Sequence, residues 1–322
     1  MSGMGQPERV RPPALQRGDT IGVIAPAGPV SADALEAGCA TLLRLGYKPT
    51  YLPSILDRDG YFAGSTARRL NELHEMFRRN DVRAVLCARG GYGCNYLLPH
   101  VDLALIRANP KIFAGCSDVT TLLTWLCDAA NLAVFHGPMA AGDFARPDGL
   151  DEQSWLAVTS STAGFRCEFS AAEVEPLRRG KAQGVLYGGC LSLLVASMGT
   201  PYEIRTEGTI LFLEDLNEPA YRIDRMLMHL KLAGKLAGVQ GILFGEMRSC
   251  GRDRTDYTLQ QVILRVLDDV RVPIAFGLKS GHVSSGNITL PFGVPARLDV
   301  GETVRLEAEA AVVASPGMVI GA

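Results

Sequence analysis

The stretch IFAGCSD, residues 112–118, joins a short apolar run to a serine that stands directly before an amphipathic segment. We interpret the run as a buried β-strand, and Leu122, Leu123 and Leu126 as the apolar face of the helix that follows. A serine at such a corner is where an α/β fold presents a nucleophile, because the turn lifts the side chain from the sheet edge and the helix N-terminus offers free N–H groups. The corner predicts a hydrolase with Ser117 as its nucleophile; the alternative is that Ser117 only caps the helix.

The corner belongs to a segment, from residue 20 to about residue 135, in which apolar strands alternate with helices. We expect strands at 21–25, 84–88, 112–114 and 132–135, and helices at 31–46, at 66–80 and after Ser117. Such alternation predicts a parallel sheet that helices cover on both faces. Ligands of such a sheet bind beyond the carboxyl ends of its strands, so the corner faces the ligand edge.

The second half of the chain is rich in short strands. We expect them at 184–187, 209–213, 241–244, 274–276, 287–290, 296–299 and 304–306, with helices at 221–232 and 259–267. This pattern predicts a separate β-rich domain with its own core. The expected division is a flexible leader at 1–13, an α/β domain at 14–165, a polar linker at 166–180 and the β-rich domain at 181–322.

Composition and charge argue against several classes of protein. The net charge of -2 comes without a basic stripe, so nucleic acid is not an expected partner. No apolar run is long enough to cross a bilayer, and the N-terminus has no apolar signal core, so we expect a cytoplasmic protein without a membrane partner. The eight cysteines include no C-x-x-C pair and the five histidines no H-E-x-x-H motif, so neither a disulfide framework nor a metal site is expected.

A glycine-rich loop, RGGYG at residues 89–93, follows the expected strand that precedes the corner. Gly90 and Gly91 allow the backbone to come close to a ligand. Their N–H groups, together with the N–H of Asp118, are candidates for an oxyanion hole in acyl transfer. The alternative is a dinucleotide fingerprint that begins at Gly91, but the chain has Tyr96 where the third glycine belongs.

The second half offers a base and an orienting carboxylate, which a serine hydroxyl needs before it becomes a good nucleophile. Glu214 and Asp215 follow an apolar strand, and His282 lies in a glycine-containing loop after another strand. His136 lies in a second glycine-containing loop. Each has an ordinary alternative, since acidic residues after strands are usually solvated and loop histidines usually lie at the surface.

In seven ordered blocks the chain resembles the LD-carboxypeptidases, the muramoyltetrapeptide carboxypeptidase family of serine peptidases. The blocks are RGGYG (89–93), GCSD (115–118), HGPM (136–139), GG (188–189), LED (213–215), PAYRIDRML (219–227) and GH (281–282). The resemblance covers almost the whole chain. It implies an α/β fold with a Rossmann-like parallel sheet in the first domain, a smaller, β-rich and barrel-like second domain, and an active site between the two.

The same resemblance implies a catalytic triad of Ser117, Glu214 and His282, with Asp215 and Glu218 as competing carboxylates. It implies a serine carboxypeptidase of cell-wall recycling that cleaves an L,D bond and releases the terminal D-alanine of murein tetrapeptide. Neither a metal nor a cofactor is expected. A homodimer is expected, because members of the family often pair.

An exopeptidase must also bind the terminal carboxylate of its substrate. Arg89 is the first candidate and Arg222 the second, although Arg222 begins a helix and could simply pair with Glu218. Tyr92 and Lys279 are further candidates for contact with the substrate.

The chain departs from the family pattern at two places. Cys190 stands where the family commonly has asparagine, so a hydrogen bond from an amide is lost or replaced by a weak thiol contact. Lys279 and Ser280 stand where less polar residues are expected before Gly281. These changes predict an altered specificity with an intact triad.

Three other functions remain open at this point. A self-immunity peptidase resembling the microcin C7 resistance protein would cleave a peptide-nucleotide antibiotic, and an aromatic ring such as that of Trp125 or Trp155 would have to stack on the base. A cysteine amidotransferase-like enzyme would use Cys116, which adjoins Ser117. A two-domain protein that only binds a small peptide in its interdomain cleft would not be an enzyme.

Overall fold

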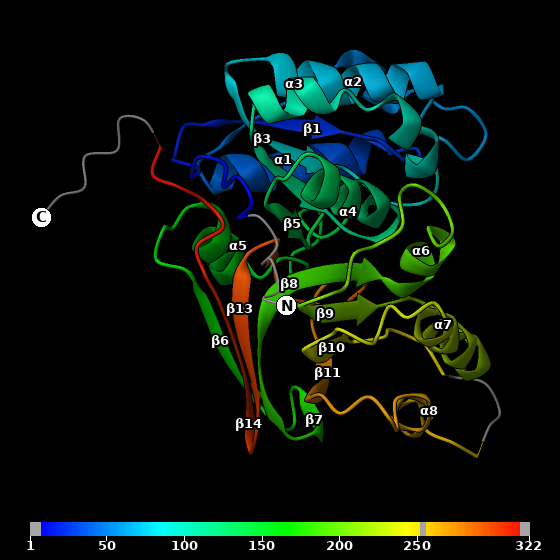
Figure 1. Cartoon of the computed structure of the whole chain (residues 1–322). Helices are drawn as coiled ribbons and strands as arrows, with labels where there is room; N and C mark the ends of the chain where they lie inside the picture. Colours follow the sequence, from blue (N-terminus) through cyan, green and yellow to red (C-terminus); the bar gives the residue numbers. More distant parts are fainter. Residues whose placement is uncertain (1–7, 252–255, 316–322) are drawn as a thin grey trace, which may run out of the picture.

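Two β-sheets form the centre of the molecule. The computed structural model describes residues 8–251 and 256–315. Figure 1 shows the first sheet with its helices in the upper part and the second sheet in the lower part. In the described residues, no helix is long and apolar enough to cross a membrane.

The first sheet has six strands in the order β12-β5-β4-β3-β1-β2. Their bounds are β1 (Thr20–Ile24), β2 (Lys48–Thr50), β3 (Val82–Cys87), β4 (Ile112–Gly115), β5 (Val134–His136) and β12 (Leu290–Phe292). The first five are parallel, as the alternation of strands and helices predicts, and β12 runs antiparallel to β5. The chain order reverses between β1 and β3, which is where open parallel sheets bind their ligands.

Helices cover this sheet on both faces. They are α1 (Ala32–Arg44), α2 (Thr66–Arg78), α3 (Leu103–Ala108), α4 (Thr120–Ala129) and α5 (Glu152–Thr159). Figure 1 shows α2 and α3 on one side of the sheet and α1 on the other. Ser31 and Ser65 fix the starts of α1 and α2, since each serine side chain accepts a backbone N–H from the first turn.

The second sheet has eight strands in the order β6-β14-β13-β8-β9-β10-β11-β7. Their bounds are β6 (Phe165–Ser170), β7 (Glu175–Arg178), β8 (Gly180–Cys190), β9 (Thr209–Glu214), β10 (Gly241–Gly245), β11 (Ile274–Leu278), β13 (Pro295–Val300) and β14 (Thr303–Ala308). The edge strands β6 and β7 follow one another in the chain, so the sheet curls until its edges come close. The sheet is barrel-like in this sense, but it is not closed, because the described strands form no ladder between β6 and β7.

Three helices accompany the second sheet: α6 (Leu191–Ala196), α7 (Ala220–Leu232) and α8 (Leu259–Val266). Strands β8, β9, β10 and β11 are parallel to one another. The parallel part arises because α7 and α8 connect β9 to β10 and β10 to β11, as crossover helices do.

The expected linker at 166–180 carries regular structure instead: it holds most of β6, all of β7 and the start of β8. Alternate residues of β6 are exposed to solvent, so its short FRCEFS sequence has the polar character that predicts a linker. The structure also differs from the expected boundary at 181, because β12 from the second half completes the first sheet.

The expected flexible leader at 1–13 is only partly within the described residues, since residues 1–7 lie outside them. Arg9 is buried, donates to the Cys127 sulfur at 2.9 Å and pairs with Asp128 at 3.2 Å. Val10 forms a β-bridge with Leu132. The second part of the leader is therefore packed against the first domain.

The carboxyl ends of both sets of parallel strands meet at one place. Ser117 follows β4 of the first sheet, while Glu214 ends β9 and His282 follows β11 of the second. Cys190, at the end of β8, is in register with Glu214. This meeting of two sheet edges positions the candidate site.

Candidate active site

Ser117 lies at a strained corner between β4 and α4. Its φ is 62°, a left-handed value that is uncommon outside glycine, and a 3-10 turn at Ser117–Val119 leads into the helix. The side chain does not cap the helix: the cap position is Val119, and no side chain bonds there. The Ser117 hydroxyl lies 3.0 Å from His282 Nε2 instead.

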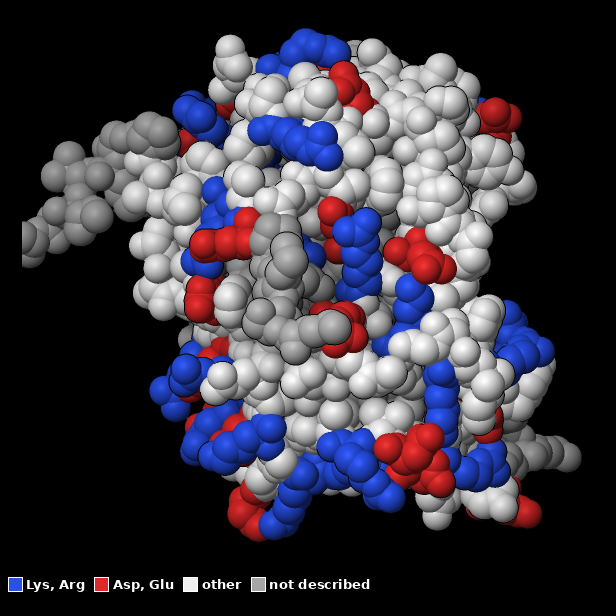
Figure 2. Space-filling view, viewed as in Figure 1, with Lys and Arg blue, Asp and Glu red and all other residues white. Residues whose placement is uncertain are grey.

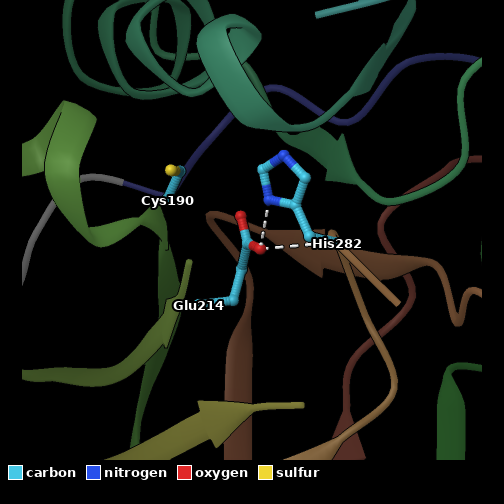
Figure 3. A group of neighbouring side chains, drawn as sticks. All are labelled: Cys190, Glu214 and His282. Atoms are coloured by element: carbon cyan, nitrogen blue, oxygen red, sulfur yellow. Dashed lines mark hydrogen bonds and ion pairs between the residues drawn. The ribbon is translucent and has the colours of Figure 1, made fainter. Parts of the chain in front are cut away.

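His282 bridges Ser117 and Glu214. Its Nδ1 lies 2.7 Å from Glu214 Oε2, and its backbone N–H donates to the same oxygen at 3.0 Å (Figure 3). A Cβ at Gly281 would come within 2.6 Å of the Glu214 carboxyl carbon, so only glycine lets the loop approach this closely. The structure thus brings Ser117, His282 and Glu214 into one hydrogen-bonded chain.

The charges of this chain favour an ionised carboxylate beside the imidazole. Burial by itself would raise the pKa of Glu214, but His282, which is hydrogen-bonded to the carboxylate, and the nearby His136 hold that pKa well below its usual value. Burial would lower the pKa of His282, yet the Glu214 carboxylate outweighs it and raises the pKa above that of an ordinary histidine. The arrangement suits a base that accepts the Ser117 proton.

The glycine-rich loop lies against Ser117. A Cβ at Gly90 would come within 2.7 Å of the Ser117 Cβ and 2.8 Å of its hydroxyl, so this position has no room for a side chain. Gly91 has a φ of 113°, and the carbonyl of Gly90 accepts the N–H of Gly28 at 3.0 Å. The loop and the Asp118 amide therefore lie beside the serine, and the oxyanion hole itself stays a prediction.

Arg69 holds the loops around the serine in place, and the sequence interpretation missed it. This arginine of α2 is almost completely buried and donates to the carbonyls of Pro26 at 2.8 Å and Gly93 at 2.7 Å. Asp118 secures the same loop from the other side, since its carboxylate accepts the Cys94 N–H at 2.8 Å. Only the burial of a charged residue reveals the role of Arg69, and the sequence pattern carries no such signal.

The competing carboxylates have other partners. Asp215 accepts the N–H groups of Ser192 at 2.8 Å and Leu216 at 2.9 Å. Glu218 pairs with Arg222 at 2.9 Å, the ordinary alternative for that arginine. Of the three carboxylates, Glu214 is the one that bonds to His282.

Cys190 lies beside Glu214 and His282, and these three could hold a metal ion, since one donor atom of each lies within 4.8 Å of the others (Figure 3). The Cys190 sulfur contacts Ser192 Oγ at 3.3 Å and Asp215 Oδ1 at 3.7 Å, the weak thiol contacts expected in place of an amide. His282 Nδ1 and Glu214 are already bonded to each other, so a cation would have to break the hydrogen-bonded chain. Metal-independent chemistry stays a prediction.

One face of the molecule carries both signs of charge. Figure 2 shows basic and acidic side chains interspersed over one face of the molecule, with no continuous stripe of one sign. This agrees with the net charge of -2 and adds no feature of a nucleic-acid interface on that face.

Comparisons with known proteins extend this geometry. The sequence profile of the LD-carboxypeptidase N-terminal domain matches residues 21–137, and that of the C-terminal domain matches residues 183–298. The chain belongs to the LD-carboxypeptidase family. The probable murein peptide carboxypeptidase of Bacillus subtilis (strain 168) is 41% identical to this chain, over 91% of the chain and 92% of the relative.

Other LD-carboxypeptidase relatives cover the chain equally well. The microcin C7 self-immunity protein of Escherichia coli is 28% identical over 88% of this chain and 92% of its own. The crystal structure of muramoyltetrapeptide carboxypeptidase from Oxalobacter formigenes has a TM-score of 0.83 at 27% identity, covering 91% of this chain and all of the other. The family resemblance and the two-sheet α/β fold are confirmed.

The residues of this LD-carboxypeptidase homologue that we expected to contact the substrate do not point to one common binding site. Arg89 is exposed and donates to the Pro29 carbonyl at 3.0 Å, and Lys279 is exposed. Tyr92 is 44% exposed and packs with Tyr96, at a ring-centroid distance of 6.1 Å. None of these side chains has a contact that assigns it to a substrate.

A cleft of about 610 Å³ opens beside His282, and the sequence interpretation missed two arginines in its wall. Arg248 follows β10 and donates to the Val283 carbonyl at 3.2 Å, and Arg146 pairs with Asp143 at 3.0 Å. The signal that could have found Arg248 is its position just after a parallel strand, at the same sheet edge as Glu214.

His136 also differs from its expected place. It ends strand β5 and is completely buried, whereas we expected a loop. Its Nε2 lies 3.9 Å from Glu214 Oε1. His136 begins the family block HGPM, but its contact partners could not be predicted from the sequence.

Proposed function

We propose that this protein is a serine carboxypeptidase in which Ser117 is the nucleophile, His282 the general base and Glu214 the residue that orients His282. One observation carries the proposal: the 3.0 Å contact of Ser117 Oγ with His282 Nε2, continued by the 2.7 Å contact of His282 Nδ1 with Glu214. Nucleophile, base and carboxylate in this order are the parts of an acyl-transfer triad.

The reaction follows from these positions. His282 takes the proton of Ser117 as the hydroxyl oxygen attacks the scissile carbonyl carbon. The amides of Asp118 and of Gly90 or Gly91 hold the oxyanion. The imidazolium of His282 then protonates the leaving amine as the C–N bond breaks, and water, activated by the same histidine, hydrolyses the acyl-enzyme.

For the terminal carboxylate we propose Arg248, in place of Arg89 and Arg222. Arg248 lines the cleft beside His282, whereas Arg222 is paired with Glu218. A guanidinium binds a carboxylate through two parallel hydrogen bonds, which would fix the end of the peptide relative to Ser117.

The proposed substrate is a murein tetrapeptide, from which the enzyme releases the terminal D-alanine at an L,D bond. The similarity to murein peptide carboxypeptidases supports this choice. Both tryptophans argue against a site that stacks on a nucleotide base: Trp155 is completely buried, and Trp125 packs edge-on against Tyr202 with ring centroids 4.8 Å apart. A peptide-nucleotide conjugate remains the second substrate to test, because a self-immunity protein is among the relatives.

Replacement of Ser117 tests the proposal. We expect Ser117→Ala to lower kcat on murein tetrapeptide on the order of 10⁴-fold or more, because the nucleophile is lost. D-Alanine release is measured by mass spectrometry, and labelling of intact protein by a fluorophosphonate should require Ser117. Cys116→Ala is the matched control; burial raises the pKa of the Cys116 thiol well above its usual value, so this neighbour should not be a thiolate.

The outcomes separate the alternatives. Full activity in Ser117→Ala with loss in Cys116→Ala would assign the chemistry to cysteine. Turnover of the nucleotide conjugate alone would replace murein as substrate. Tight peptide binding without hydrolysis or labelling would leave a binding protein.

A further inference from the structure

Two buried polar atoms of the site face each other without a hydrogen bond. His136 Nε2 and Glu214 Oε1 are both inaccessible to water, and within the described residues neither has a hydrogen-bond partner. They lie 3.9 Å apart, beyond ordinary hydrogen-bond length. A buried donor and a buried acceptor rarely stay unpaired, so this gap calls for an explanation.

The His136 ring is held where it can reach the carboxylate. It stacks on Phe292 with ring centroids 5.2 Å apart and an interplanar angle of 23°, and it packs against Phe212 at 5.2 Å. His136 is in register with Gly115 on β4 and with Leu290 on β12, so strands on both sides fix its backbone. The ring therefore has a defined place in the wall of the site.

Ser280 can set the tautomer of His136. Its hydroxyl is completely buried and lies 3.1 Å from His136 Nδ1. If the hydroxyl donates to Nδ1, the proton of a neutral ring must lie on Nε2, which points at Glu214. A less polar residue than Ser280 was expected before Gly281. The contact with His136 Nδ1 gives the Ser280 hydroxyl a structural role.

We propose, on the basis of the function proposed above, that His136 is a positioning residue that donates Nε2–H to Glu214 Oε1 in the substrate complex. The terminal torsion of a glutamate is broad, so one anchored oxygen leaves the carboxylate free to turn. His282 holds Oε2 and His136 would hold Oε1, which fixes the plane of the carboxylate. Catalytic hydrogen bonds are often long in the free enzyme and shorten in the substrate complex.

His136→Phe tests the proposal, because it keeps a ring against Phe292 and removes the donor. We expect kcat on murein tetrapeptide to fall about 10- to 100-fold, as after loss of other residues that orient a catalytic group, with KM changed little. The acid limb of kcat/KM should move to higher pH, since a carboxylate that has lost a donor attracts the His282 proton more strongly. His136→Gln should restore much of kcat, because its amide nitrogen can occupy the place of Nε2, and Ser280→Ala should give a smaller loss.

Phe77→Leu is the matched control for packing, because Phe77 is completely buried and stacks on Phe113 with ring centroids 6.1 Å apart, without contact to His136. It removes a stacking ring but no polar group, so it should lower the urea midpoint while the acid limb stays in place. Wild-type kcat and an unmoved acid limb in His136→Phe would overturn the proposal and leave His136 a packing residue. If His136→Phe fails to fold, Ser280→Ala and His136→Gln test the proposal. Wild-type kinetics in Ser280→Ala, together with a loss of kcat of about 10- to 100-fold in His136→Gln, would also overturn it.

A measurement without substrate separates this inference from the proposed function. The proton between His282 Nδ1 and Glu214 gives a downfield NMR signal when the pair is ordered. We expect that signal in the wild type, retention in His136→Gln and broadening in His136→Phe. If the wild type neither hydrolyses the peptide nor reacts with a fluorophosphonate, the proposed function fails; a signal unchanged in His136→Phe contradicts the inference independently.

Discussion

Ser117 has its neighbours because glycines allow close approach. Gly90 leaves the hydroxyl free on one side, and Gly281 lets the loop of His282 descend onto Glu214. Gly245 allows a similarly close approach to Glu214, because a Cβ at this position would come within 2.6 Å of the glutamate Cβ. At this scale the site depends as much on missing side chains as on reactive ones.

Gly90→Ala tests that dependence. The added Cβ would lie 2.7 Å from the Ser117 Cβ, so the loop or the serine has to move. We expect kcat to fall about 10²- to 10³-fold, the usual loss when one oxyanion donor is misplaced, and the free energy of unfolding to fall by about 1–3 kcal/mol from overpacking.

Gly301→Ala is its control, because the nearest atom to a Cβ there is 3.7 Å away and the backbone needs no positive φ. Activity assays and urea unfolding on both variants give the answer. An active Gly90→Ala would show that residue 90 tolerates a side chain beside the nucleophile.

The pH dependence of activity should follow His282. Because Glu214 raises the pKa of His282, the base loses activity by protonation at a higher pH than an ordinary histidine, whose pKa is about 6.5. Activity is present above the raised pKa and is lost as pH falls through it, while Glu214, with its lowered pKa, stays ionised. A kcat/KM profile between about pH 5 and 9 checks this, and an acid limb below the ordinary histidine value would contradict it.

Helix α4 connects the two sheets through hydrogen bonds to β8. Tyr187 of β8 donates to Asp128 at 2.7 Å, and Asp128 also pairs with Arg9 at 3.2 Å. The Cys190 N–H donates to Thr120 Oγ1 at 3.1 Å. These contacts tie the helix behind Ser117 to the strand beside Glu214, and so set the distance between nucleophile and carboxylate.

Tyr187→Phe removes one of these ties. We expect the free energy of unfolding to fall by about 1–3 kcal/mol, because a buried carboxylate oxygen loses its donor. Urea unfolding measures the change, with Tyr51→Phe at a 42% exposed tyrosine as control. Equal stability of the two variants would mean that water replaces the phenol.

The two domains of the molecule are less separate than the sequence predicts. β12, from near the end of the chain, completes the first sheet beside β5 and places Phe292 on His136. Arg9, near the other end of the chain, donates a hydrogen bond to Cys127 of α4. The cytoplasmic location and the homodimer stay predictions, the second of which sedimentation can measure.

A fragment of residues 1–181 should therefore not fold alone. Without β12 it exposes the apolar edge of β5, and it also lacks Tyr187, so we expect it to lose most of the roughly 5–15 kcal/mol that stabilises a typical domain. Circular dichroism and urea unfolding compare the fragment with the full chain. Cooperative unfolding of the fragment would instead support an independent first domain.

The sequence by itself determined the local features of this protein. Periodicity predicted β1, β3, β4 and β5 with the helices α1, α2 and α4, and the IFAGCSD corner placed Ser117 before α4, because both depend on neighbouring residues. Family resemblance named Glu214 and His282, but it indicated neither Arg69 nor Arg248, and it assigned no role to His136.

Only the tertiary structure decided what meets at the site. His282 and Ser117 are 165 residues apart in the chain, and His136 reaches Glu214 from the opposite sheet. Such contacts follow from the packing of two sheet edges and from burial, which no local pattern encodes. For the same reason β6 and β7 were missed, since their residues become strands through the partners that they meet. A strand was predicted close to β12, but its place in the first sheet depends on contacts that are remote in sequence.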